Sequence, residues 1–329
     1  MKKVFVSGGS GYIAMYCLKI LLLKGYHVIT SVRDKNKIEI VRSSLINHGV
    51  DCSNLEFCIL DLLSDDGWDH ALKECEYVLH MASPVIPGNV DEDILVRPAL
   101  EGMKRCLNSA IKNGVKKFVQ TSSFAAIHGN SNIKFSDDDW TDLNDKSLSP
   151  YEISKTKSEK KMWEIVKTKE IKACSINPVV VVGPSMTGVI SMSNRLSIKK
   201  IFKLPFLANV CFSIVGVNDV ANAHIKAMEL DEANGKRFLL SEKTISLIDL
   251  SKILRREGFL RVSNIILPGF ILKILSLFSP SLKTITKRLG KKEILKTNNA
   301  NTILNWNPVS VDNEIIESAK QLFSLGILK

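Results

Sequence analysis

The sequence predicts an α/β protein with a doubly wound parallel sheet of about seven strands and a smaller, mainly helical second region. Short apolar runs alternate with helical patterns through the first half of the chain, as βαβ units require. A glycine-rich turn follows the first apolar run and precedes an apolar helix, which is the order found at the first turn of such folds. The 329-residue chain is 45% hydrophobic and 24% charged, an ordinary globular composition that predicts a sizeable core.

Seven runs rich in β-branched and other apolar residues predict the strands. These runs are 3–7, 27–32, 55–60, 77–81, 117–122, 171–177 and 237–240. Helical patterns separate the first six runs, and each is long enough for a crossover between parallel strands. The predicted helices are 12–24, 35–47, 65–73, 95–113 and 149–168.

The regular alternation ends near residue 178. The segment 183–188 has the glycine, proline and serine content of a loop, and the chain from about 243 has a helical pattern without a repeated strand unit. We therefore expect the sheet domain to comprise 1–177 and 215–242. A substrate-binding region would comprise 178–214 and 243–329.

Charge and cysteine content exclude several function classes. The 45 basic and 34 acidic side chains give a net charge of +11, but they are interspersed along most of the chain, so we predict no nucleic-acid partner. The seven cysteines form no Cys-x-x-Cys pair and have no clustered histidines. This pattern predicts reduced thiols in a cytoplasmic protein without a metal site.

The sequence predicts no transmembrane segment. The N-terminal apolar run is too short for a signal peptide, and the longer run 265–278 is interrupted and shorter than the roughly 20 residues that span a bilayer. The segment 264–292 is apolar first and basic afterwards. We expect its apolar part to cover the substrate pocket, and peripheral contact with a membrane surface is the alternative. No pattern indicates an oligomeric state.

The first turn has the glycine spacing of a dinucleotide site. Gly8, Gly9 and Gly11 follow the first strand, and Ala14 stands where a third small residue is needed. One glycine allows the tight turn, another allows the backbone to approach a pyrophosphate, and the small residue allows close packing of helix against strand. The N–H groups at the helix start then face the phosphates. This context predicts a Rossmann-type domain.

The end of the second predicted strand indicates which dinucleotide binds. The strand ends at Val32, and Arg33, Asp34 and Lys37 follow. An acidic residue at the strand end holds the ribose hydroxyls of NAD, whereas arginine accommodates the additional phosphate of NADP. Arg33 can form charge-assisted hydrogen bonds with that phosphate. We therefore predict NADP as the cofactor in preference to NAD.

A candidate catalytic group lies in the second half of the sheet domain. Tyr151 and Lys155 are four residues apart at the start of a predicted helix and share one face. An adjacent ammonium is expected to lower the pKa of the tyrosine and make it a better proton donor for carbonyl reduction. Ser123 follows a predicted strand, where its hydroxyl could donate a hydrogen bond to a substrate oxygen.

These motifs resemble, in type and in order, those of extended short-chain dehydrogenases/reductases. The similarity is strongest to the dihydroflavonol 4-reductase-like and methylglyoxal/aldehyde reductase-like branch, and it covers about residues 1–230. The matching segments are the glycine turn, Val32-Arg33-Asp34, Leu60-Asp61-Leu62, His80-Met81-Ala82-Ser83-Pro84, Val96 to Gly102, Thr121-Ser122-Ser123, Tyr151-x-x-Ser154-Lys155, Asn177-Pro178 with Gly183-Pro184, and Asp219-Val220-Ala221-x-Ala223-His224.

The resemblance implies a role for each matching residue. Tyr151 would be the general acid, Lys155 would lower its pKa and hold the nicotinamide ribose, and Ser123 would orient the substrate carbonyl. The other implied cofactor contacts are Gly8, Gly11, Tyr12 and Ile13 at the pyrophosphate, Arg33 and Lys37 at the 2′-phosphate, Asp61 and Leu62 at the adenine, Ala82 and Ser83 at the ribose, and Pro178 and Val181 at the nicotinamide.

The function implied is an NADPH-dependent reductase of small-molecule aldehydes or ketones. Phe124 stands where plant reductases of this type have small residues, and 145–150 lacks the Asn-Trp-Tyr-Cys motif of cinnamoyl-CoA reductases. We expect the pocket to be formed by Val85-Ile86-Pro87, Phe124 and the loosely patterned segments after Gly183. The alternatives are a nucleotide-sugar epimerase or dehydratase, a 3β-hydroxysteroid dehydrogenase, and a dinucleotide-sensing regulatory protein without turnover.

Overall fold

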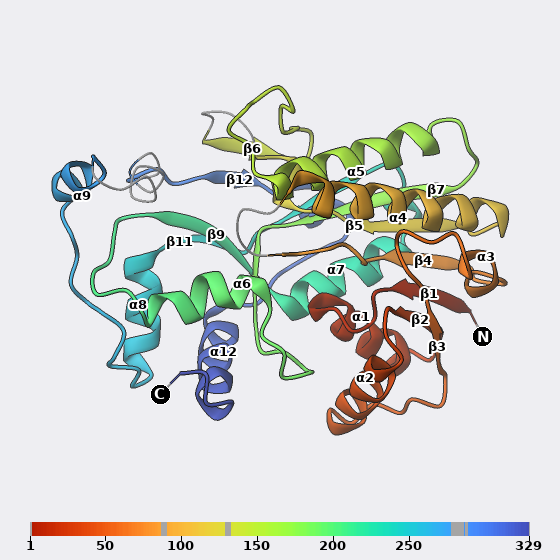
Figure 1. Cartoon of the computed structure of the whole chain (residues 1–329), viewed down its shortest axis with the longest axis horizontal. Helices are drawn as coiled ribbons and strands as arrows, with labels where there is room; N and C mark the ends of the chain where they lie inside the picture. Colours follow the sequence, from red (N-terminus) through yellow and green to blue (C-terminus); the bar gives the residue numbers. More distant parts are fainter. Residues whose placement is uncertain (1, 87–90, 129–132, 278–285, 287–288, 329) are drawn as a thin grey trace.

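Seven parallel strands form the central sheet of the computed structural model, which describes residues 2–86, 91–128, 133–277, 286 and 289–328 (Figure 1). The strand order is β10-β7-β5-β4-β1-β2-β3. The strands are β1 (Lys3–Ser7), β2 (His27–Val32), β3 (Leu55–Ile59), β4 (Tyr77–His80), β5 (Lys117–Thr121), β7 (Lys172–Pro178) and β10 (Arg237–Leu240). All seven predicted strands are present, so the predicted fold class is confirmed. The direction in which successive strands are added to the sheet reverses between β1 and β4. These two strands are parallel, and the glycine turn follows the carboxyl end of β1.

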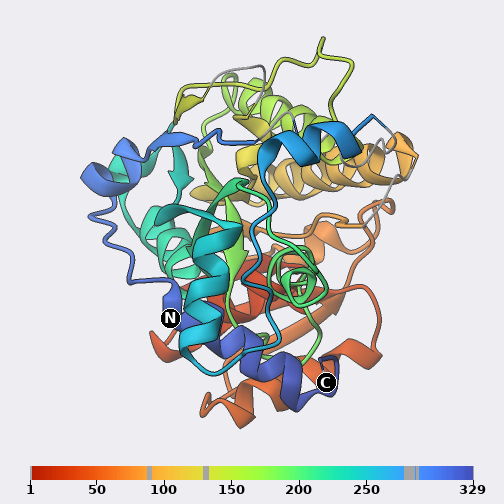
Figure 2. The same cartoon turned by 90° about the vertical axis from the view of Figure 1, so that its left-hand side faces the viewer.

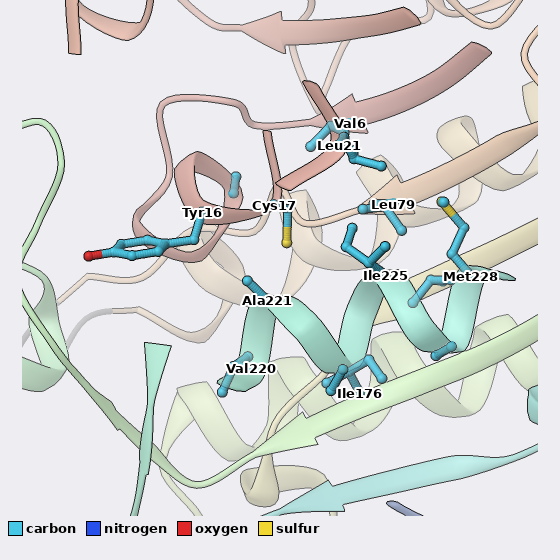
Figure 3. Packing of buried hydrophobic residues seen from close by; sticks show 14 of the residues in the cluster. Val6, Tyr16, Cys17, Leu21, Leu79, Ile176, Val220, Ala221, Ile225 and Met228 are labelled. Atoms are coloured by element: carbon cyan, nitrogen blue, oxygen red, sulfur yellow. The ribbon is translucent and has the colours of Figure 1, made fainter. Parts of the chain in front are cut away.

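Helices cover both faces of the sheet (Figure 1). One face carries α1 (Tyr12–Leu23), α2 (Asn36–Asn47) and α7 (Val217–Glu229), and the other carries α3 (Trp68–Ala71), α4 (Glu92–Lys112) and α5 (Pro150–Val166). Figure 3 shows the first face, where Cys17 and Leu21 of α1 and Ala221 and Ile225 of α7 pack together against the strands. These side chains are all buried. They form a continuous apolar layer between the helices and this face of the sheet.

Local sequence explains where the site-bearing helices begin. Ser149 caps α5 by accepting a hydrogen bond from the Glu152 backbone, Glu152 bonds back to Ser149, and Pro150 occupies the first turn. This capping box fixes the start of the helix that carries Tyr151. Asp91 caps α4, so that helix begins three residues earlier than predicted. The predicted helix 65–73 is shorter than expected, because only Trp68–Ala71 is helical.

Five further strands, most of them in the second region, were not predicted from the sequence pattern. A three-stranded sheet has the order β11-β9-β8, and β12 pairs with β6. The strands are β6 (Lys134–Ser136), β8 (Val180–Val182), β9 (Cys211–Gly216), β11 (Lys243–Ser246) and β12 (Ile294–Lys296). The tail after 243, which was expected to be helical without a repeated strand unit, also contains the short strands β11 and β12. Four of these five strands have only three or four residues, which is too short to show a period, and their partners are distant in the chain.

Helices complete this region, which Figure 2 shows from its outer side. They are α6 (Met192–Asn194), the π-helical turn η2 (Arg195–Lys199), α8 (Leu247–Arg256), α9 (Gly269–Leu275), α11 (Asn298–Ile303) and α12 (Asp312–Ser324), and short turns η1 (Phe124–Ala126) and η3 (Asp231–Ala233) lie elsewhere. The apolar faces of α8 and α12 bury Leu254 and Ile315 in a separate core cluster. Pro87 and the basic residues Lys283, Lys287 and Arg288 lie outside the described residues. Within the described part, no helix is long and apolar enough to cross a bilayer.

Candidate active site

The glycine turn connects β1 to α1 and is hydrogen-bonded to the end of β2. Gly8 has a φ of +71°, a left-handed conformation that glycine adopts without a steric penalty. Its N–H donates to the Ser31 hydroxyl at 3.0 Å, and the Gly9 N–H donates to the Ser31 carbonyl at 2.8 Å. A Cβ at Gly9 would lie 2.1 Å from the Thr30 hydroxyl oxygen. The close packing of this turn against β2 therefore excludes a larger residue at Gly9.

The amino-terminal end of α1 has the features of an anion-binding site. Gly11 precedes the helix in an extended conformation, no side chain caps the helix, and its first turn contains no acidic residue. The first N–H groups of a helix have no partner within it and carry positive partial charge. They border the cleft at Gly11, Tyr12 and Ile13. This arrangement suits the pyrophosphate of a dinucleotide.

A cavity of about 670 Å³ extends from the turn along the ends of β2, β3 and β4. The Arg33 side chain is 87% exposed at its edge, with Nε 3.7 Å from an Asp61 carboxylate oxygen. Residues predicted at the phosphate, adenine and ribose line it, namely Gly8, Gly11, Arg33, Asp61, Leu62, Ala82 and Ser83. Lys37 lies partly buried on α2 and is not among the described lining residues. Ser10, Ser31, Ile94, Arg97 and Pro98 line it without having been assigned a role from sequence.

A neighbouring cavity of about 530 Å³ continues from the first, and both are bordered by Gly11, Met81 and Ser83. The Ser83 hydroxyl is buried and has no hydrogen-bond partner in the described structure. A buried hydroxyl without a partner is energetically costly. An extended polar ligand that runs through both cavities would pass this hydroxyl, so the residues present fit a dinucleotide.

The candidate catalytic side chains meet in this second cavity. Ser123 comes from the end of β5, Tyr151 and Lys155 come from α5, and all three line the cavity. The Ser123 hydroxyl accepts a hydrogen bond from the Ala125 N–H at 3.1 Å. The predicted cofactor contacts Tyr12, Ile13, Pro178 and Val181 line the same cavity.

Burial shifts the pKa of both ionisable groups of this pair. It raises the pKa of Tyr151, although the hydrogen bond from Ser123 opposes the shift. Burial also lowers the pKa of Lys155 to about 8, although the Glu159 carboxylate opposes that shift. The Lys155 ammonium donates to the Thr121 carbonyl at 3.2 Å. Burial therefore outweighs the groups that stabilise the phenolate, and the pKa of Tyr151 lies above its usual value. The role of Lys155 in lowering that pKa stays a prediction.

A buried carboxylate supports the strand ends beneath the site. Glu159 on α5 is fully buried and accepts from Arg237 at 2.6 Å and from Asn177 at 2.7 Å. Ser122 and Ser175 also donate to it. Burial alone would raise the pKa of Glu159, but Arg237 and these hydrogen bonds outweigh it and hold the pKa below its usual value. This network, which we call the Glu159 network, joins α5 to β7, to β10 and to the residue that follows β5.

His224 supports the same strand end from the opposite face. Its Nδ1 lies 2.8 Å from the Val220 carbonyl and its Nε2 lies 2.8 Å from the Thr121 hydroxyl. Because a carbonyl only accepts, Nδ1 carries the proton and Nε2 accepts from Thr121. Burial lowers the pKa of His224 to about 4. The histidine is therefore neutral and structural.

A third cavity of about 440 Å³ opens next to Tyr151 and shares Ser123, Tyr151 and Pro178 with the second. Val85, Ile86 and Phe124, which were predicted to form the substrate pocket, line it together with Met192, Ser193, Leu196 and Phe212. Three polar residues that were not predicted, His128, Glu152 and Glu293, also line this cavity, and we call them its polar rim. His128 lies 3.8 Å from Glu152 and 3.3 Å from Glu293, which arrives from the distant segment before β12. We call this third cavity the substrate cavity.

Known proteins share both the sequence and the architecture of this chain. The model of the NAD dependent epimerase/dehydratase family matches residues 4–240. Cinnamoyl-CoA reductase CAD2 of Medicago truncatula is 34% identical over 261 residues, covering 77% of this chain and 79% of that protein. Anthocyanidin reductase of Arabidopsis thaliana is 30% identical over 260 residues, covering 71% and 74%. Yeast methylglyoxal/isovaleraldehyde reductase Gre2, solved with NADPH, has a TM-score of 0.82 and 25% identity, covering 99% of this chain and 100% of that chain.

Proposed function

Because the chain belongs to the NAD-dependent epimerase/dehydratase family and is an NADP-dependent oxidoreductase, we propose that it reduces an aldehyde or ketone with NADPH, with Tyr151 as the proton donor. One observation carries this proposal: Ser123, Tyr151 and Lys155 line one cavity, which is bordered by the glycine turn on one side and joins the substrate cavity on the other. The NADPH seen in the yeast structure supports the choice of cofactor.

NADPH bound in the cleft would supply a hydride to the carbonyl carbon of the substrate. Ser123 and Tyr151 would then hold the carbonyl oxygen by hydrogen bonds as negative charge develops on it. The Tyr151 hydroxyl would transfer its proton to that oxygen, and the raised pKa keeps this proton in place at neutral pH. Lys155 would contribute its ammonium beside the ribose.

The acidic side chains at the rim of the substrate cavity indicate which charge the substrate carries. Burial alone would raise the pKa of Glu152, but His128 and the Ser149 hydrogen bonds hold it below its usual value, so this carboxylate is ionised. Glu293 adds a second carboxylate to the rim. Two acidic side chains disfavour an anionic substrate, and 145–150 lacks the Asn-Trp-Tyr-Cys motif. We therefore propose an uncharged carbonyl substrate in preference to a coenzyme A thioester.

Replacing Arg33 tests the cofactor assignment. We expect Arg33→Ala to raise KM for NADPH about tenfold and to leave KM for NADH nearly unchanged, because only NADPH has the phosphate that arginine would bind. The measurement is initial-rate kinetics with each cofactor on one carbonyl substrate. Lys35→Ala, an exposed change on the same segment, is the matched control, and Lys37→Ala tests the second predicted phosphate contact. Equal losses with both cofactors would refute the role of Arg33.

The lowered pKa of Lys155 predicts an alkaline limit to activity. Lys155 has a pKa of about 8 in the structure and 10.5 as its ordinary value, so its charge is lost as pH rises through about 8. Since the ammonium is needed beside the cofactor, we expect kcat/KM for NADPH to fall about tenfold per pH unit above that value. Tyr151 remains protonated there because its pKa is raised. A profile that stays flat to pH 10 would contradict this assignment.

We also propose that the enzyme works in the cytoplasm. All seven cysteines are free thiols. Burial raises the pKa of Cys17, Cys106 and Cys174, so these three thiols stay protonated and unreactive at neutral pH. This state suits a reducing compartment. Fractionation of cells that express a tagged chain tests the location.

A further inference from the structure

A fourth cavity, mostly apolar and of about 490 Å³, borders the substrate cavity. It is formed by η2, by the segment 200–212 that leads into β9, by the start of α8 and by two residues from the segment around α9. The described residues that line it are Val180, Leu196, Ser197, Lys200, Ile201, Leu204, Pro205, Phe206, Leu207, Ala208, Val210, Cys211, Phe212, Leu247, Leu267 and Leu272. We call it the tail cavity.

The two cavities share a wall. Val180, Leu196 and Phe212 border both the tail cavity and the substrate cavity, and they come from β8, η2 and β9. Leu196 lies on the π-helical turn and is 61% exposed. A half-exposed leucine loses little packing when its side chain changes rotamer. A change of the Leu196 rotamer would open an apolar path from the Tyr151 side of the wall into the tail cavity.

The chemistry of the tail cavity selects an uncharged hydrocarbon group. Among its described lining residues Lys200 is the one charged side chain, and it is exposed. Ser197 supplies the one hydroxyl group of this lining, and apolar side chains make up most of the remainder. The size lies within the range of ligand-binding pockets. In contrast, the rim of the substrate cavity has His128, Glu152 and Glu293, so an apolar group is better placed beyond the wall than at the rim.

The segment around α9 lies against the tail cavity. Leu267 and Leu272 line the tail cavity, and no described residue between 264 and 277 lines the substrate cavity. The described apolar part of this segment, which was expected to cover the substrate pocket, therefore borders the tail cavity and not the substrate cavity.

We infer that the preferred substrates are aldehydes or ketones with an unbranched apolar tail, with the carbonyl at Ser123 and Tyr151 and the tail extending past Leu196 and Phe212 into the tail cavity. This inference rests on the proposed carbonyl reduction. It assigns the tail cavity as the part of the site that determines chain length.

A homologous series of ketones tests the inference. We expect kcat/KM with NADPH to rise from 2-butanone to 2-decanone, by roughly fourfold for each methylene that enters the tail cavity. Ala208→Phe places a large side chain in the cavity and should abolish this rise while leaving the rate with 2-butanone within about twofold. Val309→Phe introduces the same side chain at an exposed position outside the site and should keep the rise. Val210→Phe serves as a second cavity-filling variant if Ala208→Phe does not fold.

The outcomes separate this inference from the proposed function. Rates that rise with chain length equally in the wild type and in both cavity-filling variants would overturn the tail cavity while leaving carbonyl reduction intact. Wild-type rates that do not depend on chain length would also overturn the tail cavity and leave carbonyl reduction intact. If the wild type reduces no carbonyl compound, the proposed function fails. Calorimetric binding of 2-decanone to the enzyme with NADP⁺ then gives a separate readout, and binding that is unchanged by Ala208→Phe and Val210→Phe would overturn the tail cavity.

Discussion

Tyr151→Phe is expected to lower kcat by roughly 10²- to 10⁴-fold, the range that a positioned general acid contributes. The change removes one oxygen atom, which carries the only proton that the proposed mechanism assigns to the alkoxide. The aromatic ring remains, so the cavity keeps its shape and NADPH binding should be unchanged. Steady-state NADPH oxidation and NADPH fluorescence titration measure the two quantities separately.

The control for this change is Tyr26→Phe. Tyr26 donates from its hydroxyl to the Glu229 carboxylate at 2.8 Å, on the side of the sheet domain away from the described lining of the three cavities. The same atom is removed, but turnover should stay near the wild-type value. Full turnover in Tyr151→Phe would show that another group protonates the product. A parallel loss of NADPH binding would show that the tyrosine holds the cofactor instead.

Glu159→Gln is expected to reduce the free energy of unfolding by about 3–5 kcal/mol, the usual cost of removing one partner of a buried ion pair. The amide cannot accept from Arg237, Asn177, Ser122 and Ser175 together, because one of its two polar atoms is a donor. It also leaves the buried Arg237 guanidinium without its counterion. Urea denaturation followed by circular dichroism measures the change.

Glu164→Gln makes the same substitution on the same helix at an exposed pair. The Glu164 carboxylate lies 2.8 Å from the Lys161 ammonium, and the two side chains are 69% and 36% exposed. Exposed pairs contribute about 0–1 kcal/mol, so this variant should unfold close to the wild-type urea concentration. Equal losses in the two variants would show that burial does not set the strength of the Glu159 network.

Sequence patterns predicted the sheet domain because its information is local. Each strand run from 3–7 to 237–240 is long enough to show its apolar character, and the intervening helices have their own period. The glycine turn and the Tyr151–Lys155 spacing are local as well. For this reason Ser123, Tyr151 and Lys155 could be named before the fold, and the structure places all three in one cavity.

Other features depend on packing that a linear pattern does not contain. Glu159 has the sequence context of an exposed helical residue, and only the fold places it beneath β5 and β7. The raised pKa of Tyr151 depends on burial, whereas the sequence supplied only its distance from Lys155. The pairing of β8 with β9 and of β9 with β11 joins short segments that are far apart, and the tail cavity forms between them and α9.

The Glu159 network also has a consequence for the order in which the chain is made. Glu159 and Arg237 are separated by 78 positions, so the ribosome synthesises the carboxylate well before its counterion. A nascent chain that ends before β10 has no cation for this buried position, and the cost of burying an unpaired charge opposes the docking of α5 on the sheet. We therefore expect the catalytic half of the domain to complete its folding only after its last strand has been synthesised.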